Sequence, residues 1–277
     1  MALTEVIKEL LENGVHFGHL SKHWNPKMKK FIFGKKKNIY IIDLEKSAQK
    51  LEEAKEFAKK SIQNGEKILF VATKKQLRDL IKEQAVSCGM PYVVERWVGG
   101  LLTNYSTIRS RIKRYVTLLE KRQNGEFEKM PRKEVTKLNR EIERMDKIYS
   151  GLVSLDKLPG SIYVIDPKRE VACVREANRL SVPIIGLIDT DADPEVIDYP
   201  IPGNDDAIKS VRYITSKVVE TIKEEAQRTA ELIKRTAEEK EEDLKVDVEK
   251  YENLEEDIGT EKGKKEAPKK KQPHKEV

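Results

Sequence analysis

Short, unbroken apolar segments alternate with amphipathic helical segments along most of this chain, and this alternation restricts the possible folds more than any other feature. Residues 67–73 and 182–189 are continuous apolar runs, whereas residues 76–88 carry apolar side chains at helical spacing. A strand that is apolar on both faces needs cover on both faces, which is typical of parallel sheets flanked by helices. The pattern predicts a doubly wound α/β fold of about five strands, flavodoxin-like in broad class.

The predicted elements follow one another with short connections. We predict strands at residues 38–43, 67–73, 91–94, 161–166 and 182–189. We predict helices at residues 47–64, 76–88, 170–180 and 206–228. Glycines directly after the first two helices support their predicted ends.

The alternation breaks between residues 104 and 152. Apolar residues recur there every three or four positions on two successive segments, and Gly125 and Pro131 mark a turn between them. A stripe of two apolar residues in seven is narrower than the face of a helix that packs on a sheet. We therefore predict an inserted antiparallel coiled-coil hairpin, with two ordinary surface helices as the alternative.

Three regions follow from this reading. Residues 1–103 and 153–228 form a discontinuous α/β domain, and residues 104–152 form the hairpin. Residues 229–277 are dense in charge and poor in apolar side chains, so we predict an extended or disordered tail.

The segment predicted as a hairpin carries an excess of positive charge as large as that of the whole chain. The sequence has 54 Lys and Arg against 48 Asp and Glu, a net charge of +6. Between Asn104 and Ser150 there are 13 basic and 7 acidic residues, so the excess in this segment equals that of the whole chain. A projecting basic hairpin favours an anionic partner.

A second basic segment lies near the N-terminus. Residues 21–38 contain seven lysines and no acidic residue. Lysines neutralise phosphates, and Trp24 could stack on a base or ribose, so the segment predicts RNA binding. The alternative is a solvated lysine-rich face. We expect residues 31–33, Phe-Ile-Phe, to pack in the core.

Sequence motifs for catalysis are missing. The chain has no GxxxxGK[ST] phosphate loop, no GxGxxG after a strand, and no nucleophile elbow. A non-catalytic protein is predicted, and a flavodoxin-like enzyme that binds a small molecule or nucleotide is the alternative. Aspartates at predicted strand ends, such as Asp166, are expected to cap helices and close turns.

A metal site is a weaker hypothesis. His16 and His19 are three residues apart, and Asp189 and Asp205 follow predicted strands or turns at the sheet edge. Imidazole and carboxylate groups can share zinc or magnesium. Local hydrogen bonding by the histidines is the alternative, and no cofactor is required by the sequence.

The sequence also favours a location in the cytoplasm. It has two cysteines, Cys88 and Cys173, far apart and outside any CxxC pair, which fits a reducing compartment. We see no signal peptide and no apolar run long enough for a membrane span, so no membrane partner is expected.

Several motifs occur in an order that resembles a known family. They are GVHFGH at 14–19, WNPKMKKFIFG at 24–34, ILFVATK at 68–74, RWVGGLLTN at 96–104 and VIDYPIPGNDDAI at 196–208. Together they resemble the bacterial ribosomal protein S2 family from the N-terminus to about residue 225.

The resemblance implies a flavodoxin-like domain with a coiled-coil hairpin and a structural role in the small ribosomal subunit. It implies small-subunit ribosomal RNA and other small-subunit proteins as partners, among them the mRNA-binding protein S1, and no small-molecule substrate. With the basic residues noted above, it gives a set of candidate RNA-binding residues. They are Lys22, His23, Trp24, Lys27, Lys29, Lys30, Lys35, Lys36, Lys37, Lys74, Lys75, Arg96, Trp97, Asn104, Arg109, Arg111, Lys113 and Arg114.

Overall fold

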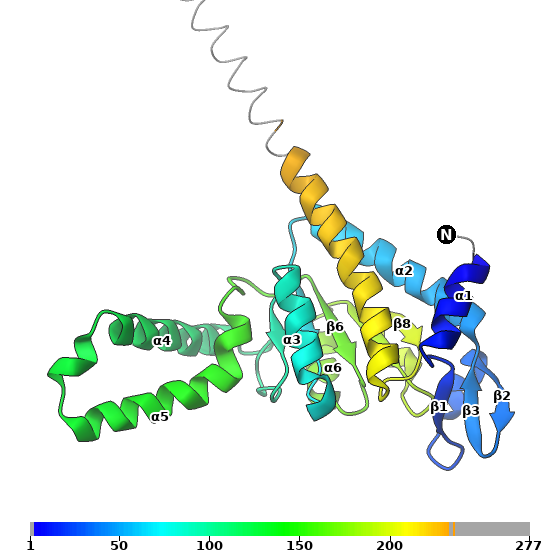
Figure 1. Ribbon diagram of the computed structural model, residues 1–277, viewed down its shortest axis with the longest axis horizontal. Coiled ribbons are helices and arrows are strands. Elements are labelled where there is room, and N and C mark those ends of the chain that lie inside the picture. Colours follow the sequence, from blue (N-terminus) through cyan, green and yellow to red (C-terminus); the bar gives the residue numbers. More distant parts are fainter. Residues whose placement is uncertain (1–2, 233–234, 236–277) are drawn as a thin grey trace, which may run out of the picture. The chain divides into compact units, whose positions relative to one another are not determined.

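The computed structural model describes residues 3–232 and 235, shown in colour in Figure 1. The chain separates into two units, Met1–Ala226 and Gln227–Val277. In the second unit the described residues, 227–232 and 235, are helical. Most of the predicted charged tail therefore lies outside the described residues.

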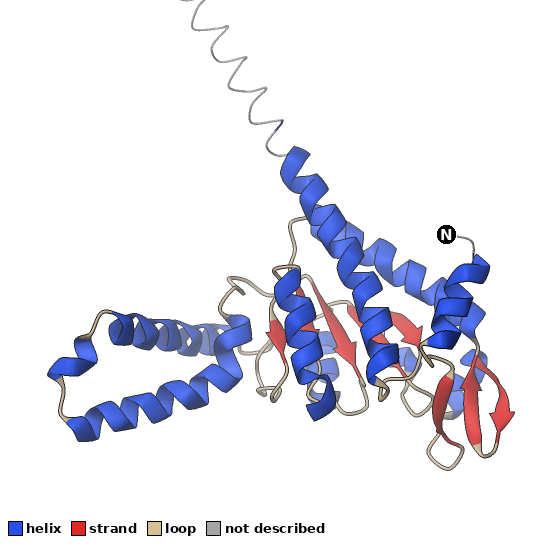
Figure 2. Cartoon of the chain, viewed as in Figure 1, coloured by secondary structure: helices blue, strands red, loops and turns tan. Residues whose placement is uncertain are grey.

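A five-stranded parallel sheet forms the centre of the first unit (Figure 2). Its strands are β4 (Ile68–Val71), β5 (Tyr92–Val93), β6 (Ser161–Ile165), β7 (Ile184–Ile188) and β8 (Tyr199–Pro202). They lie in the order β5-β4-β6-β7-β8, which is the flavodoxin-like order, and every residue of β4, β6 and β7 is buried. The predicted fold class is confirmed.

The membership of the sheet differs from the prediction. Residues 38–43 were expected to supply one strand, but β3 (Ile39–Ile42) is the middle strand of a separate antiparallel sheet, between β1 (Phe17–Leu20) and β2 (Ile32–Lys36). The fifth parallel strand is β8, which was not predicted. Its sequence, Tyr-Pro-Ile-Pro, has two prolines, and prolines are tolerated only on edge strands.

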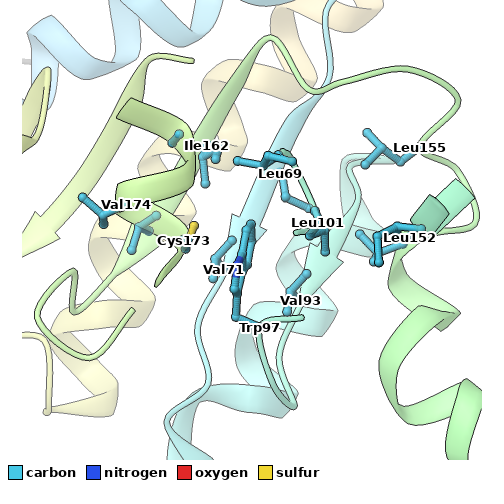
Figure 3. Packing of buried hydrophobic residues seen from close by; sticks show 14 of the residues in the cluster. Leu69, Val71, Val93, Trp97, Leu101, Leu152, Leu155, Ile162, Cys173 and Val174 are labelled. Carbon is cyan, nitrogen blue, oxygen red and sulfur yellow. The ribbon is translucent and has the colours of Figure 1, made fainter. Parts of the chain in front are cut away.

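Helices cover the two faces of the parallel sheet unequally. On one face, α1 (Leu3–Glu12), α2 (Leu44–Gln63), α3 (Arg78–Ser87) and the helix at 208–226 pack on the sheet through one apolar cluster. On the other face lies α6 (Val171–Arg179). Alternate residues of β4 serve the two faces, since Phe70 packs with the first group and Leu69 with the second. Figure 3 shows the second cluster from close by.

The insertion is an antiparallel pair of helices, α4 (Tyr105–Gln123) and α5 (Arg132–Tyr149), which extends away from the sheet in Figure 1. Arg114 pairs with Glu141 across the two helices at 2.9 Å, and the Tyr115 hydroxyl donates to Asp146. On α4, the spacing of three and four residues predicts a stripe of Ile108, Ile112, Tyr115 and Leu119; the first three are buried, but Leu118 is more buried than Leu119. The knobs-into-holes packing of a coiled coil stays a prediction.

None of the helices in the described part of the chain is long and apolar enough to cross a membrane.

Candidate nucleic-acid interface

The first half of the basic N-terminal segment is held against the sheet. Residues Pro26–Phe31 form a short 3₁₀ helix, η1, whose Met28 and Phe31 are buried in the second apolar cluster. The connection from β7 to β8 contains only a short 3₁₀ turn, η5 (Pro194–Val196), and η1 contacts it. The basic segment thus supplies cover that a longer crossover helix would otherwise give.

Lys27 takes part in this anchoring. Its Nζ lies 2.8 Å from Asp193 and 2.6 Å from Glu195. Hydrogen bonds to these two carboxylates raise the pKa of Lys27, and the bond to Lys27 in turn lowers the pKa of Asp193. The expectation that Lys27 faces RNA does not fit this arrangement, because its charge already has two acidic partners.

The second half of the segment ends in a basic β-hairpin tip. Lys37 and Asn38 have φ values of 47° and 65°, and β2 and β3 pair directly on either side of them. Two successive left-handed residues are typical of the type I′ turn, whose twist matches the strands. The basic tip, defined as Lys35, Lys36 and Lys37, is exposed, and none of its lysines has an ion pair with another described residue.

The remaining residues of this segment differ in exposure. Lys22, His23, Lys29 and Lys30 are exposed, and the Trp24 ring lies 4.9 Å from that of Tyr40 and is half-buried. Phe31 is buried as expected, but Phe33 is 81% exposed, so the expectation that it packs in the core is wrong. The bulge between Ile32 and Gly34 in the β2–β3 pairing lies at this residue.

Three of the RNA-binding candidates on the hairpin have no acidic partner among the described residues. Arg109, Arg111 and Lys113, here called the hairpin arm, are exposed on α4, and none pairs with a described acidic residue. Arg109 and Lys113 are four residues apart and therefore lie on one face of the helix. Arg114, also an RNA-binding candidate, pairs with Glu141.

The loop before the hairpin contains both exposed and buried candidates. Arg96 is exposed, whereas Trp97 is 8% exposed and its Nε1 donates to Glu176 at 3.0 Å. The prediction that the Trp97 ring faces RNA is therefore wrong, because the indole is in the core. Asn104 lies at the start of α4, where its Oδ1 accepts a hydrogen bond from the Thr107 hydroxyl.

Lys74 lies at the carboxyl end of β4, at the switch point of the sheet. Its Nζ is within 2.8–2.9 Å of a carboxylate oxygen of each of three aspartates, Asp166, Asp205 and Asp206. Burial lowers the pKa of Lys74, but the aspartates outweigh this and the pKa is raised. Lys74 is therefore a structural cation and does not fit its predicted contact with RNA, whereas the neighbouring Lys75 is exposed.

His19 joins the same group of carboxylates. Its Nδ1 lies 2.8 Å from Asp189 and its Nε2 lies 3.5 Å from Asp206. Asp189 raises the pKa of His19 to about 9, and burial raises the pKa of Asp205 to about 8 against the opposing charge of Lys74. Close approach of β1 needs the glycine at 18, where a Cβ would lie 2.6 Å from Thr190 Cγ2.

This edge cluster, defined as His19, Asp189, Asp205 and Asp206, contains three of the four residues that were proposed as metal ligands. The candidate ligand atoms of His19, Asp205 and Asp206 lie within 4.8 Å of one another. Asp206 was not predicted, although it directly follows Asp205. His16 is not in the group: its ring lies 4.0 Å from that of Phe17, and burial lowers its pKa.

Comparison with known proteins gives a consistent result. The sequence model described as Ribosomal protein S2 matches residues 10–225. The small ribosomal subunit protein uS2 of Dictyoglomus thermophilum is 54% identical over 219 residues, which cover 79% of this chain and 89% of that protein. The protein of the same name from Coprothermobacter proteolyticus is 48% identical over 218 residues, covering 79% and 81% of the two chains.

Proposed function

This chain belongs to the ribosomal protein S2 family, and from that premise we propose which of its surfaces meet ribosomal RNA. It is a structural constituent of the small ribosomal subunit and not an enzyme, so the enzyme alternative is not favoured. The basic tip and the hairpin arm bind RNA phosphates. One observation supports this proposal: these six basic residues are exposed without acidic partners, whereas Lys27, Lys74 and Arg114 are paired.

Salt dependence tests the contribution of the tip. Each phosphate contact adds about 0.7–0.9 to the slope of log affinity against log salt concentration, because binding releases counterions. We expect Lys35→Gln with Lys36→Gln to flatten the slope by about 1.4–1.8 units, measured on small subunits depleted of this protein. Lys27→Gln is the control and should leave the slope nearly unchanged. A wild-type slope in the double variant would contradict the proposal for the tip.

The edge cluster is proposed to hold a divalent cation, most simply zinc. Its imidazole and carboxylate donors suit zinc, which would tie β1 to the carboxyl edge of the sheet. Because Lys74 Nζ lies 2.8–2.9 Å from Asp205 and Asp206, a metal would compete with this lysine.

Elemental analysis tests this proposal. After loading and dialysis, the wild-type chain should retain about one zinc ion and gain thermal stability, since a ligand that binds only the folded state stabilises it. His19→Ala should lose both effects. His16→Ala should keep them, because His16 lies outside the cluster. Absence of zinc from the loaded wild-type protein would end the hypothesis.

The partners include neighbouring proteins of the small subunit, and among them we propose the mRNA-binding protein S1. Its support here is an exposed apolar surface, where Leu11 and Phe33 line a hollow of about 350 Å³ together with His16. We expect a photo-crosslinking residue at position 33 to capture S1 in assembled subunits and to fail at the exposed position 60.

We also propose that the chain resides in the cytoplasm.

A further inference from the structure

Glu176 is an acidic residue of α6 that was not a candidate from the sequence, yet it is bound to the root of the hairpin by five hydrogen bonds. Oε1 accepts from Trp97 Nε1 at 3.0 Å and from the Gly100 amide at 2.8 Å. Oε2 accepts from the Leu102 amide at 3.0 Å and from the amide and hydroxyl of Thr103, each at 3.2 Å. Every donor belongs to the loop at 97–103, which leads directly into α4.

The carboxylate is ionised in this position. Burial raises the pKa of Glu176, but the hydrogen bonds from Trp97 and the three amides outweigh it, and the pKa is lowered. No lysine or arginine of the described chain forms an ion pair with it. Backbone amides that converge in a turn form a site for an anion, and here the turn before α4 is occupied by a side chain from α6.

Apolar contacts also hold this loop. Trp97, Leu101 and Leu102 are buried in the second apolar cluster, where Trp97 and Leu101 lie beside strands β4 and β5 in Figure 3. Gly100 has a φ of +84°, and a Cβ there would lie 3.4 Å from Asn104 Cβ. The loop is therefore fixed by both polar and apolar contacts, and it sets the direction in which α4 leaves the sheet.

We propose that Glu176 is a positioning residue for RNA binding: by holding the loop at 97–103, it aims the hairpin arm at the RNA. This inference rests on the proposed contact between the arm and ribosomal RNA. Glu176 itself carries the wrong charge to touch a phosphate, so it acts only through the loop.

The sign of its charge makes the inference testable. Glu176→Gln removes one negative charge from a basic region, so electrostatics alone would tighten RNA binding or leave it unchanged. Positioning predicts the opposite, because the NH2 group of Gln replaces one carboxylate oxygen and cannot accept the two or three hydrogen bonds that this oxygen now receives. We expect affinity for small subunits depleted of this protein to fall roughly tenfold, a change of about 1.4 kcal/mol.

Glu120→Gln is the matched control. Glu120 is exposed on α4, and its substitution removes the same charge without a contact to the loop. It should bind as the wild type does or slightly tighter. Equal affinity of the Glu176→Gln and Glu120→Gln variants would overturn the inference.

Two further measurements keep the test independent of global stability. Hydrogen exchange at the Gly100, Leu102 and Thr103 amides should accelerate in the folded Glu176→Gln variant. Unchanged exchange would show that Glu176 does not hold the loop at 97–103. Thr103→Val removes only one donor and keeps the carboxylate. It should weaken binding about twofold, in line with loss of one of the two longest of the five bonds. If Glu176→Gln does not fold, wild-type affinity in Thr103→Val overturns the inference.

The proposed function and the positioning role of Glu176 can be contradicted by different results. If substitutions in the hairpin arm do not weaken binding, the arm does not contact RNA. If they do weaken it while Glu176→Gln does not, only the positioning role of Glu176 is lost.

Discussion

Replacing Arg109, Arg111 and Lys113 with glutamine is expected to flatten the slope of log affinity against log salt concentration by about two to three units. These side chains are exposed and have no acidic partner in the described chain, so they can neutralise RNA phosphates and release the cations condensed on them. Affinity for small subunits depleted of this protein should fall most at low salt, where the electrostatic contribution is largest. Filter binding over a series of salt concentrations measures both quantities.

The control removes the same charge from the opposite side of the sheet. Lys8, Lys60 and Lys82 are exposed on α1, α2 and α3, which cover the face of the sheet opposite α6 and the second apolar cluster. Their replacement with glutamine should leave the slope nearly unchanged. If both triple variants shift the slope equally, binding follows net charge and the arm has no special role.

Phe70→Ala is expected to lower the free energy of unfolding by about 3–5 kcal/mol. Phe70 is fully buried in β4, and its ring centroid lies 5.1 Å from that of Tyr163 in the neighbouring strand. Truncation removes apolar contacts and leaves a cavity that the sheet and the helices on it cannot fill. Chemical denaturation followed by circular dichroism measures the change.

Phe33→Ala is the control for the same substitution. The Phe33 side chain is 81% exposed, so its removal should change the free energy of unfolding by less than about 0.5 kcal/mol. A large effect at Phe33, or a small one at Phe70, would show that the burial described here does not determine stability.

Most of the parallel strands that could be predicted have side chains buried on both faces. The exception is β5, which was predicted at residues 91–94 although Tyr92 is half-buried. Continuous apolar runs identify β4, β6 and β7. Residues 38–43 have a similar run, but an apolar segment does not specify its partner, and this one pairs with β1 and β2. β8 was not predicted because its two prolines are unusual in a strand, and its place in the sheet is set by pairing with β7.

For the candidate site, the sequence identifies the basic residues but does not show which of them have acidic partners in the fold. The basic tip and the hairpin arm are visible in the sequence, but the acidic partners of Lys27 and Lys74 lie 166 and 131 residues away. Only the fold brings these charges together and removes the two lysines from the RNA-binding set. Glu176 is likewise an ordinary helical glutamate until the loop at 97–103 folds over it.

The prolines of β8 also bear on what happens to the chain before it enters a ribosome. β8 pairs with β7 in parallel, and the Gly203 amide donates a hydrogen bond to the Ile188 carbonyl. Because amides alternate in direction along a strand, the odd-numbered residues of β8 point their amides toward β7. Pro200 and Pro202 therefore stand at the positions whose amides would point away from the sheet. This edge therefore offers no N–H donor at those two positions. The opposite edge, β5, is two residues long and contacts the turn at Ser150–Leu152. Neither edge is a good template for a strand from another molecule, which protects newly made chains from aggregating through their sheets.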